Sequence, residues 1–291
     1  MLVQDITSSL AQATDFASQA LNAQVQRQQQ LVLRFSDYNR EQQLRLTQLC
    51  QQLDGVVLAS PEQLTVLLNQ TAGRQLTHQW SRVFTDQATT QIQLTQIMKQ
   101  YDVFWQAGEH RFNLTKKPMI YGIMNITPDS FFDGGQYKTK DDVLNHVDAM
   151  LQAGADVIEV NGQTTRPGFT EVTPQVELDR TLPYIRAIKA RFPEAVLAVD
   201  TYKYDVMQAV LEEGVSIIND VNAFTDDPRK LKLMADSRVG LLTMHSSRDQ
   251  EYTDLTSSMR GFFEQNLAAL TSHGIDIERI ALDPVSYTHL R

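Results

Sequence analysis

The chain has 291 residues, a formal net charge of -9 and a single cysteine, Cys50. This length accommodates one large domain or two modest ones, each able to bury a core. The acidic balance argues against a nucleic-acid partner, because neutralising phosphates requires a basic surface. One cysteine cannot form a disulfide within the chain, which favours a reducing compartment. The sequence has no apolar run of about 18 residues and no signal-peptide pattern, so we expect no membrane span and a cytoplasmic location.

Composition divides the chain into two parts. Residues 1–117 contain 23 glutamines, whereas the remaining 174 residues contain seven and carry the whole acidic excess, with 16 Lys and Arg against 26 Asp and Glu. We therefore predict a glutamine-rich α+β module over residues 1–102. A hairpin over residues 103–117 is expected to lead into a second domain over residues 118–284.

Short patterns predict the elements of the N-terminal module. Leu31–Leu33 and Gly55–Leu58 are apolar runs typical of strands, and the leucine spacing over Glu41–Leu53 predicts a helix. Ser60–Pro61 predicts a helix start, with serine as the N-cap and proline in the first turn. The apolar flanks around Gly108 predict the hairpin.

From Met119 onward, strand, loop and helix patterns alternate. Six apolar runs predict strands, at residues 120–124, 155–160, 196–199, 216–219, 239–243 and 279–282. Helices are predicted from Thr139 to a stop at Gly154, over residues 173–191 and over residues 202–213. This order predicts an α/β fold with a parallel sheet of the (β/α)8 TIM-barrel type, incomplete, with about six of its eight strands. A doubly wound open sheet is the alternative, ranked second because no glycine-rich dinucleotide fingerprint follows the first strand.

Polar residues gather after the first strand, in the run from Tyr121 to Tyr137. Asn125 ends the strand, and Asp129, Ser130 and Asp133 follow on the loop. Magnesium prefers hard oxygen ligands and keeps several waters, so Asn125 together with substrate phosphates is a candidate Mg2+ site. The structural alternative is that Asn125 only caps the loop.

The second predicted strand leads into E-V-N-G-Q-T-T-R-P-G, residues 159–168. Thr164 and Thr165 supply hydroxyl donors. The planar guanidinium of Arg166 suits a phosphate or carboxylate, which it can bind through two hydrogen bonds. A surface salt bridge is the alternative for this arginine.

The later strands also end in polar side chains. Asp200 leaves an apolar strand, where its carboxylate needs a partner, and the two N–H groups of an aminopyrimidine ring would satisfy it. Asn219 can both donate and accept at a heterocycle edge. Asp283 ends the sixth strand at the same level. His245 follows the fifth strand and is assigned no role.

Four segments together resemble dihydropteroate synthase in order and spacing over residues 103–284: G-I-M-N-I-T-P-D-S-F-F-D-G-G, T-T-R-P-G, V-D-T and I-N-D. The resemblance implies a transferase of folate biosynthesis that joins (7,8-dihydropterin-6-yl)methyl diphosphate to p-aminobenzoate and releases diphosphate. It implies small-molecule substrates, with a homodimer as a candidate assembly.

The resemblance also implies roles for individual residues. Asn125 would hold Mg2+ on the diphosphate, and Asp129, Thr165 and Arg166 would be catalytic, with Thr165 also contacting substrate. The pterin ring would be held by Asp200, Asn219 and Asp283. The chain departs from the family's usual Asp-x-Gly-Gly-Glu-Ser-Thr-Arg-Pro, because it has Glu159, Asn161, Gln163 and Thr164 there, and Phe132 stands where a serine is common.

The C-terminal residues depart from the family more strongly. After A-L-D-P the family continues with a glycine-rich loop, a lysine-bearing strand and an Arg-x-His strand, whereas residues 285–291 are V-S-Y-T-H-L-R. This tail resembles a translated sequencing adapter, so we expect it to be non-native and the sequence to be truncated. The 291-residue polypeptide is then expected to be poorly soluble and inactive, and a complete protein to be active.

Two other functions remain open at this stage. A pterin-binding methyltransferase with a corrinoid partner could hold the ring with the same Asp and Asn residues, but it would not need the Thr-Arg-Pro loop for diphosphate. A non-catalytic pterin-binding paralogue would bind the ring without turnover. A purely structural role is disfavoured, because the polar residues gather at one end of the predicted sheet.

Overall fold

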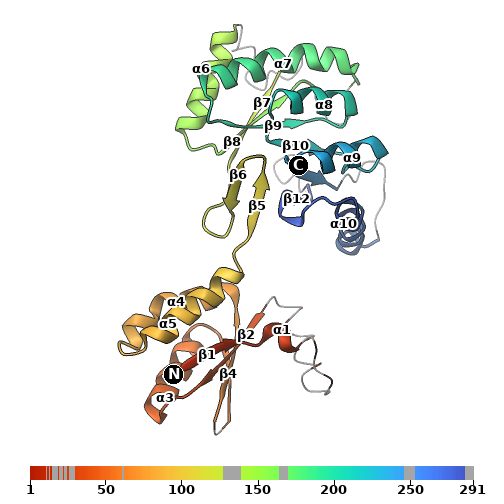
Figure 1. Ribbon diagram of the computed structural model, residues 1–291. Helices are drawn as coiled ribbons and strands as arrows, with labels where there is room; N and C mark the ends of the chain where they lie inside the picture. The colour runs from red at the N-terminus through yellow and green to blue at the C-terminus, as the bar shows by residue number, and fades with distance from the viewer. Residues whose placement is uncertain are drawn as a thin grey trace. The chain divides into compact units, whose positions relative to one another are not determined.

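The computed structural model describes residues 1–10, 30–60, 62–126, 139–163, 170–245 and 253–285, together with residues 12, 14, 19, 22 and 25. The chain forms two compact units, unit 1 over Met1–Asp102 and unit 2 over Val103–Arg291 (Figure 1). Among the described residues, no helix is both long enough and apolar enough to cross a membrane.

Unit 1 is built on a four-stranded antiparallel sheet with the order β1-β2-β4-β3. Its strands are β1 (Leu2–Asp5), β2 (Gln30–Ser36), β3 (Val56–Ala59) and β4 (Leu64–Asn69). Its helices include α1 (Thr7–Leu10), α3 (Arg40–Gln52), α4 (Gln70–Val83) and α5 (Ala88–Gln100). The core is centred on Trp80, whose ring stacks between Phe35 and Phe84 at centroid distances of 5.9 and 4.4 Å.

The helix start predicted at Ser60 is wrong. The Ser60 backbone N–H and hydroxyl both donate to the carbonyl of Gln63, at 2.9 and 3.0 Å, and this turn joins β3 to β4 as a hairpin. The helix begins later, at Gln70, where the Asn69 side chain accepts the backbone N–H of Ala72 as the N-cap.

Unit 2 begins with a hairpin and continues as a parallel sheet. The hairpin pairs β5 (Phe104–Ala107) with β6 (His110–Asn113), and Gly108 adopts a φ of 61° at the turn, where a side chain would be strained. The six-stranded sheet has the order β12-β11-β10-β9-β8-β7. Its strands are β7 (Tyr121–Asn125), β8 (Val157–Asn161), β9 (Val196–Asp200), β10 (Ile217–Asp220), β11 (Gly240–Met244) and β12 (Ile280–Asp283).

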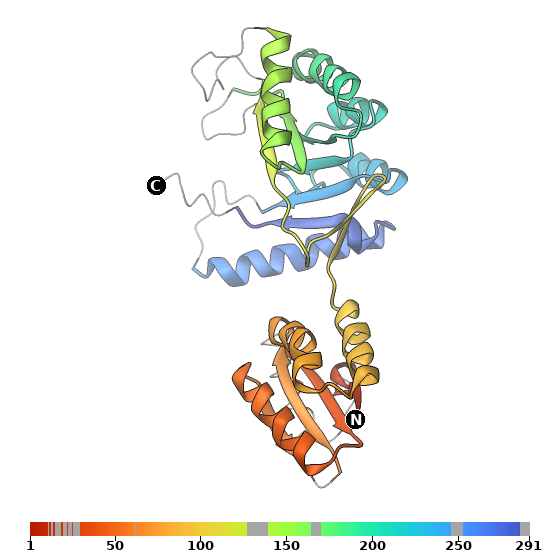
Figure 2. The same ribbon diagram turned by 90° about the vertical axis from the view of Figure 1, so that its left-hand side faces the viewer.

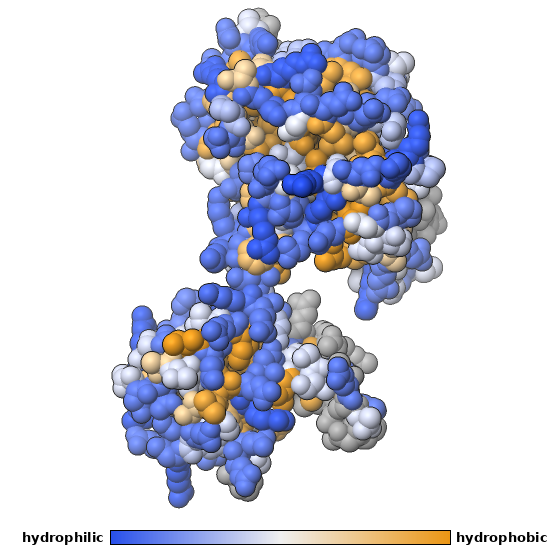
Figure 3. Space-filling view, viewed as in Figure 1, coloured by the Kyte–Doolittle hydropathy of each residue, from blue (hydrophilic) through white to orange (hydrophobic). Residues whose placement is uncertain are grey.

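Five helices among the described residues of unit 2 pack against one face of this sheet (Figure 2). They are α6 (Lys140–Gln152), α7 (Pro174–Arg191), α8 (Tyr204–Glu212), α9 (Pro228–Asp236) and α10 (Leu255–Ser272), and a short 3-10 helix, η1 (Ile277–Arg279), precedes β12. Alternate strand residues such as Ile158 and Val160 turn toward these helices, since successive side chains of a strand point to opposite faces. Hydrophilic residues cover most of unit 2 in the view of Figure 3, with apolar residues showing between them.

The opposite face of the sheet packs on the hairpin at the amino ends of the strands. Trp105 and Ala107 are buried there with Val157, Val196 and Ile217. The Trp105 indole N–H donates to the carbonyl of Arg279 at 2.9 Å. The hairpin therefore covers this face at the amino ends of the strands, and the carboxyl ends of the strands lie at the opposite edge of the sheet.

The predicted α/β fold with a parallel six-stranded sheet is confirmed. Each strand lies within two residues of its predicted position, because each is a short apolar run between polar segments. Among the described residues, β7 and β12 do not pair with each other, so the sheet is open. Helices α9 and α10 were not predicted.

Candidate functional site

Six polar side chains lie at or near the carboxyl ends of five strands of unit 2. We call them the strand-end cluster: Asn125, Glu159, Asn161, Asp200, Asn219 and Asp283. Strand register brings them level in pairs, since Asn125 pairs with Asn161 and Asn219 pairs with Asp200. Because the strands are parallel, all their carboxyl ends meet at one edge of the sheet.

Asn161 links three strands of the cluster. Its Nδ2 donates to Asn125 Oδ1 at 3.3 Å and to Glu159 Oε1 at 3.0 Å, and its Oδ1 accepts the backbone N–H of Asp200 at 3.1 Å. Asn161 is buried. This side chain therefore ties the end of β7 to the ends of β8 and β9.

Glu159 is the buried carboxyl group at the base of the cluster. Its Oε1 accepts Nδ2 of Asn161, and its Oε2 accepts Nδ2 of Asn219 at 3.3 Å. Burial raises the pKa of Glu159, and the negative charge of Asp283 adds to that increase, while the two amide donors oppose it. The two amides are the stabilising partners that a buried carboxylate needs.

Two other carboxylates lie at the strand ends. Asp200 ends β9 and is half-buried. Asp283 ends β12, where its Oδ1 accepts the backbone N–H of Val285 at 2.9 Å and its carbonyl accepts the backbone N–H of His245 at 2.9 Å. The His245 ring is buried edge-on against Phe262, at a centroid distance of 5.0 Å, which is a packing arrangement.

A second buried network lies where β8 leads toward the Thr-Arg-Pro segment. The Lys203 ammonium contacts Glu177 Oε2 of α7 at 2.7 Å and Gln163 Oε1 at 2.5 Å. Gln163 also donates to the Tyr202 hydroxyl at 3.0 Å and accepts the backbone N–H of Val172 at 3.0 Å. The network thus holds the chain on both sides of residues 164–169.

A third network is structural. Asp220 ends β10 but points away from the cluster, toward α9, where the buried Lys230 ammonium contacts its Oδ2 at 2.9 Å. Asp220 also accepts the backbone N–H groups of Asn222 and Phe224. Burial raises the pKa of Asp220, and Lys230 opposes that increase.

The catalytic residues predicted from the sequence, Asp129, Thr165 and Arg166, lie outside the described residues. Of the other predicted site residues, the structure brings Asn125, Asp200 and Asn219 into one hydrogen-bonded group through Asn161 and Glu159. The negative charge of Asp283 contributes to the raised pKa of Glu159.

The donor set suits magnesium better than a softer metal. Asn125 supplies a neutral oxygen at a half-buried strand end, and Mg2+ prefers such hard ligands with waters and phosphates completing its shell. Among the described residues, no group of three or more His, Cys, Asp and Glu side chains could hold a metal by itself. Asn125 therefore fits an ion whose other ligands come from substrate and water.

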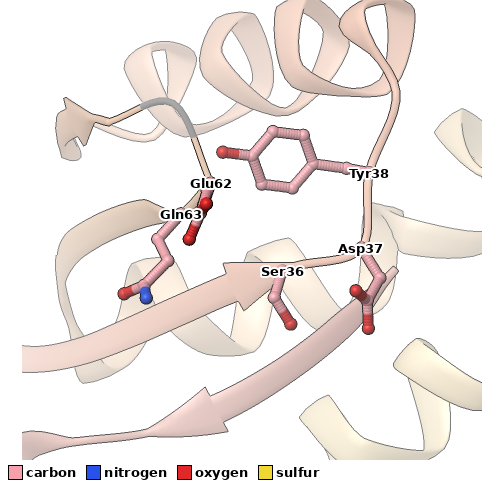
Figure 4. Close-up of a pocket in the computed structure, with 5 residues that line it drawn as sticks. All are labelled: Ser36, Asp37, Tyr38, Glu62 and Gln63. Atoms are coloured by element: carbon pink, nitrogen blue, oxygen red, sulfur yellow. The ribbon is translucent and has the colours of Figure 1, made fainter.

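Unit 1 has a pocket of its own, of about 450 Å³, lined by Ser36, Asp37, Tyr38, Glu62 and Gln63. Figure 4 shows the Tyr38 ring extending toward the segment that carries Glu62 and Gln63, with the Asp37 carboxylate pointing away from the ring. Its charged side chains are both acidic, so it does not suit an anionic substrate. We assign no function to it.

Sequence reasoning missed the importance of Glu159 and Asn161, which it treated only as departures from a motif. The spacing of two residues between Glu159 and Asn161 could have indicated their role. In β8, residues 157, 159 and 161 share one face, and Glu159 and Asn161 are therefore on the face opposite the helices. Two polar residues on that face of a buried strand predict a polar site.

A parallel α/β sheet with converging amides and carboxylates at its carboxyl ends defines a ligand-binding protein of the TIM-barrel class. The family model described as pterin binding enzyme matches residues 121–289, which is more than half of the chain. The chain belongs to the pterin-binding enzyme family.

Relatives in this family are dihydropteroate synthases. That of Streptococcus pyogenes is 38% identical over 174 residues, covering 60% of this chain and 65% of the relative. That of Bacillus subtilis is 35% identical over 169 residues, covering 58% of this chain and 59% of the relative. The chain thus spans less than two thirds of the length of these curated relatives. The resemblance noted in the sequence is confirmed.

Solved structures similar to this chain are also dihydropteroate synthases. A dihydropteroate synthase of Xanthomonas albilineans with 4-aminobenzoic acid has a TM-score of 0.57 and 34% identity, covering 63% of this chain and 67% of that one. A Burkholderia cenocepacia dihydropteroate synthase complexed with 7,8-dihydropteroate has a TM-score of 0.55 and 31% identity, covering 63% and 64%. The TIM-barrel type of fold is thereby confirmed.

Proposed function

We propose that the full-length protein is a dihydropteroate synthase. It condenses (7,8-dihydropterin-6-yl)methyl diphosphate with p-aminobenzoate to give dihydropteroate and diphosphate. The observation that carries this proposal is the strand-end cluster, in which buried and half-buried amides and carboxylates converge in a chain of the pterin-binding family. Similarity to synthases solved with 4-aminobenzoic acid and with 7,8-dihydropteroate supports it.

The cluster matches the hydrogen-bonding edge of a pterin. The aminopyrimidine part of the ring presents N–H donors, and the carboxylates of Asp200 and Asp283 are acceptors when ionised. The amide oxygen of Asn219 adds a neutral acceptor. Binding at three fixed strand ends would hold the ring in one orientation, which leaves its methylene carbon directed to the second substrate.

Magnesium is the proposed cofactor, with Asn125 Oδ1 as its protein ligand. When bound, the ion would neutralise charge on the diphosphate leaving group. The hydrogen bond from Asn161 Nδ2 turns Oδ1 of Asn125 to a defined position and leaves a second lone pair on that oxygen.

The proposed reaction is a displacement at the pterin methylene. The amine nitrogen of p-aminobenzoate forms a bond to this carbon, the carbon–oxygen bond to diphosphate breaks, and the amine loses a proton. Arg166 is proposed to stabilise the departing diphosphate, and Thr165 and Asp129 to contact the substrates at the same end of the sheet. A strong general base is not required, because the arylammonium group formed by the attack is acidic enough to lose its proton to water or to the departing diphosphate.

A cytoplasmic location and a homodimer stay predictions. Cys50 is a buried thiol, and burial raises its pKa to about 12, so it is unreactive at neutral pH. This fits the reducing compartment in which the substrates of the proposed reaction would be met.

The first prediction is the reaction itself. The full-length protein, given both substrates and Mg2+, is expected to release diphosphate and form dihydropteroate in equal amounts, with neither product when one substrate is left out. Diphosphate release coupled to a colour reaction and mass spectrometry of the pterin product measure this. Pterin binding without either product would contradict the proposal and indicate a non-catalytic pterin-binding protein. Methyl transfer from methyltetrahydrofolate to a corrinoid would indicate the methyltransferase.

The Asp200→Asn variant tests the site within the same assay. Removing one charged acceptor for a substrate N–H is expected to lower kcat/KM by about tenfold to a hundredfold. Lys232→Ala is the matched control, because Lys232 is an exposed residue of α9 that pairs only with Asp236 among its described neighbours. Equal activity of the two variants would show that Asp200 does not contact the substrate.

A further inference from the structure

The amide of Asn219 has one satisfied end and one unsatisfied end. Its Nδ2 donates to Glu159 Oε2, but its Oδ1 is buried and has no hydrogen-bond partner among the described residues. Leaving a buried acceptor unpaired destabilises a folded protein, so such an atom at a binding site indicates where a ligand donor is received.

The orientation of this amide follows from the chemistry of Glu159. An amide has a donor end and an acceptor end of nearly the same shape, and the hydrogen-bond partners decide which way it turns. Burial raises the pKa of Glu159, but the amide donors of Asn161 and Asn219 favour its ionised form, and an ionised carboxylate can only accept. The two oxygens of Glu159 therefore each face an Nδ2 group, and the oxygen of Asn219 is turned away from the carboxylate.

Asn161, the other amide on Glu159, is held by two further contacts. Its Oδ1 accepts the backbone N–H of Asp200, and its Nδ2 also donates to Asn125. Turning Asn161 over would break both. Among the described residues, Asn219 makes no side-chain hydrogen bond besides the one to Glu159, so Glu159 is the hydrogen-bond partner that determines its direction.

We propose that Glu159 is a positioning residue that makes the binding site specific for a 2-amino heterocycle. It fixes Asn219 so that Oδ1 faces the ring as an acceptor, beside the carboxylates of Asp200 and Asp283. An exocyclic amino group carries two N–H donors and can be shared between a carboxylate and an amide oxygen. A 2-oxo ring presents an acceptor at that position and would be repelled.

This inference rests on the proposed pterin-binding function and adds the origin of its selectivity. The test compares Glu159→Gln with Glu159→Asp in the full-length protein. Glutamine has the same shape but offers one donor and one acceptor, so one neighbouring amide has to turn over, and that amide is Asn219. Aspartate keeps two acceptor oxygens on a side chain that is one methylene shorter.

The measurement is the ratio of dissociation constants for 6-hydroxymethyl-7,8-dihydropterin and its 2-oxo analogue, obtained by calorimetry without turnover. The unaltered protein and Glu159→Asp are expected to prefer the 2-amino ring strongly. In Glu159→Gln the preference is expected to fall by about tenfold or more, the effect of exchanging an acceptor for a donor at one hydrogen bond. A ratio is used because a general loss of folded protein would weaken the binding of both ligands equally.

Three outcomes count against the inference. An unchanged ratio in Glu159→Gln would overturn it while leaving pterin binding intact. If the preference for the 2-amino ring fell equally in Glu159→Asp, the preference would depend on the shape of the side chain and not on its two acceptor oxygens. Failure of the unaltered protein to bind either ring would refute the pterin-binding function itself, and the inference with it.

Discussion

At the residue scale, the site depends on how buried polar groups are paired. Glu159 and Asn161 form one hydrogen-bonded unit with Asn219, and Lys203 forms another with Glu177 and Gln163. In both units each carboxylate accepts from at least one amide or ammonium group. These pairings hold side chains in single orientations, which is what a site for a flat, rigid ring requires.

The pair of Asp220 and Lys230 provides a prediction on stability. Both side chains are buried, so Lys230→Met leaves the Asp220 carboxylate without its counter-ion. Unfolding in urea is expected to show a loss of about 3–5 kcal/mol. Lys232→Met, on the exposed side of the same helix, is the control and is expected to change nothing measurable. A small effect of Lys230→Met would mean that Asp220 becomes protonated or solvated in the folded protein.

Part of the strand-end cluster was predictable at this scale and part was not. Asp200, Asn219 and Asp283 stand out in the sequence because each ends an apolar run. Glu159 and Asn161 do not, because their importance depends on which face of β8 is turned to the helices, and that is settled only by neighbouring strands. The pairing of Lys203 with Glu177 joins residues 26 positions apart, a distance at which local patterns carry no information.

At the scale of elements, the hairpin packs closely against the sheet of unit 2 at the amino ends of its strands. A Cβ atom on Gly240 of β11 would lie 2.8 Å from Ala107 Cβ and 3.1 Å from the Trp105 ring. Ala107 and Trp105 are both buried, so neither can move aside easily. The absence of a side chain at Gly240 is what allows β5 to cross β11.

Gly240→Ala is therefore expected to destabilise the protein by about 1–3 kcal/mol through overpacking, measured by urea unfolding. Adding Ala107→Gly removes the closest contact and should restore part of the loss. Gly261→Ala is the control, since Gly261 lies in α10 with open space around it, and that change should stabilise the helix by up to about 1 kcal/mol. If Gly240→Ala were neutral, the hairpin would not pack on β11 as described.

Elements were predicted well where one signal dominates. The six strands of unit 2 are apolar runs, and helices α6 and α7 begin at threonine caps, Thr139 and Thr173, that each accept a backbone N–H. Ser60–Pro61 misled because serine and proline open turns as readily as helices. The run that follows, Leu64–Asn69, pairs with β3, which directly precedes it, and with β2, which is distant in sequence, and that pairing overrides the local preference.

At the scale of the whole molecule, the chain combines a pterin-family unit with a second compact unit that has its own core. The sequence predicts such a division from composition, because glutamines concentrate in residues 1–117, a range that also includes the hairpin at the start of unit 2. Unit 2 carries every described residue of the strand-end cluster. The expectations of poor solubility and of a non-native tail stay predictions, since residues 286–291 are not among those described.

One geometric claim is central, that a pterin ring binds at the carboxyl ends of β9, β10 and β12, against Asp200, Asn219 and Asp283. A crystal structure of the full-length protein with a bound 7,8-dihydropterin tests it most directly. We expect the aminopyrimidine edge within about 3.5 Å of the Asp200 carboxylate and of Asn219 Oδ1, with Glu159 still accepting both amides behind them. A ring found elsewhere on the molecule, or Asn219 turned with its nitrogen toward the ring, would contradict the account.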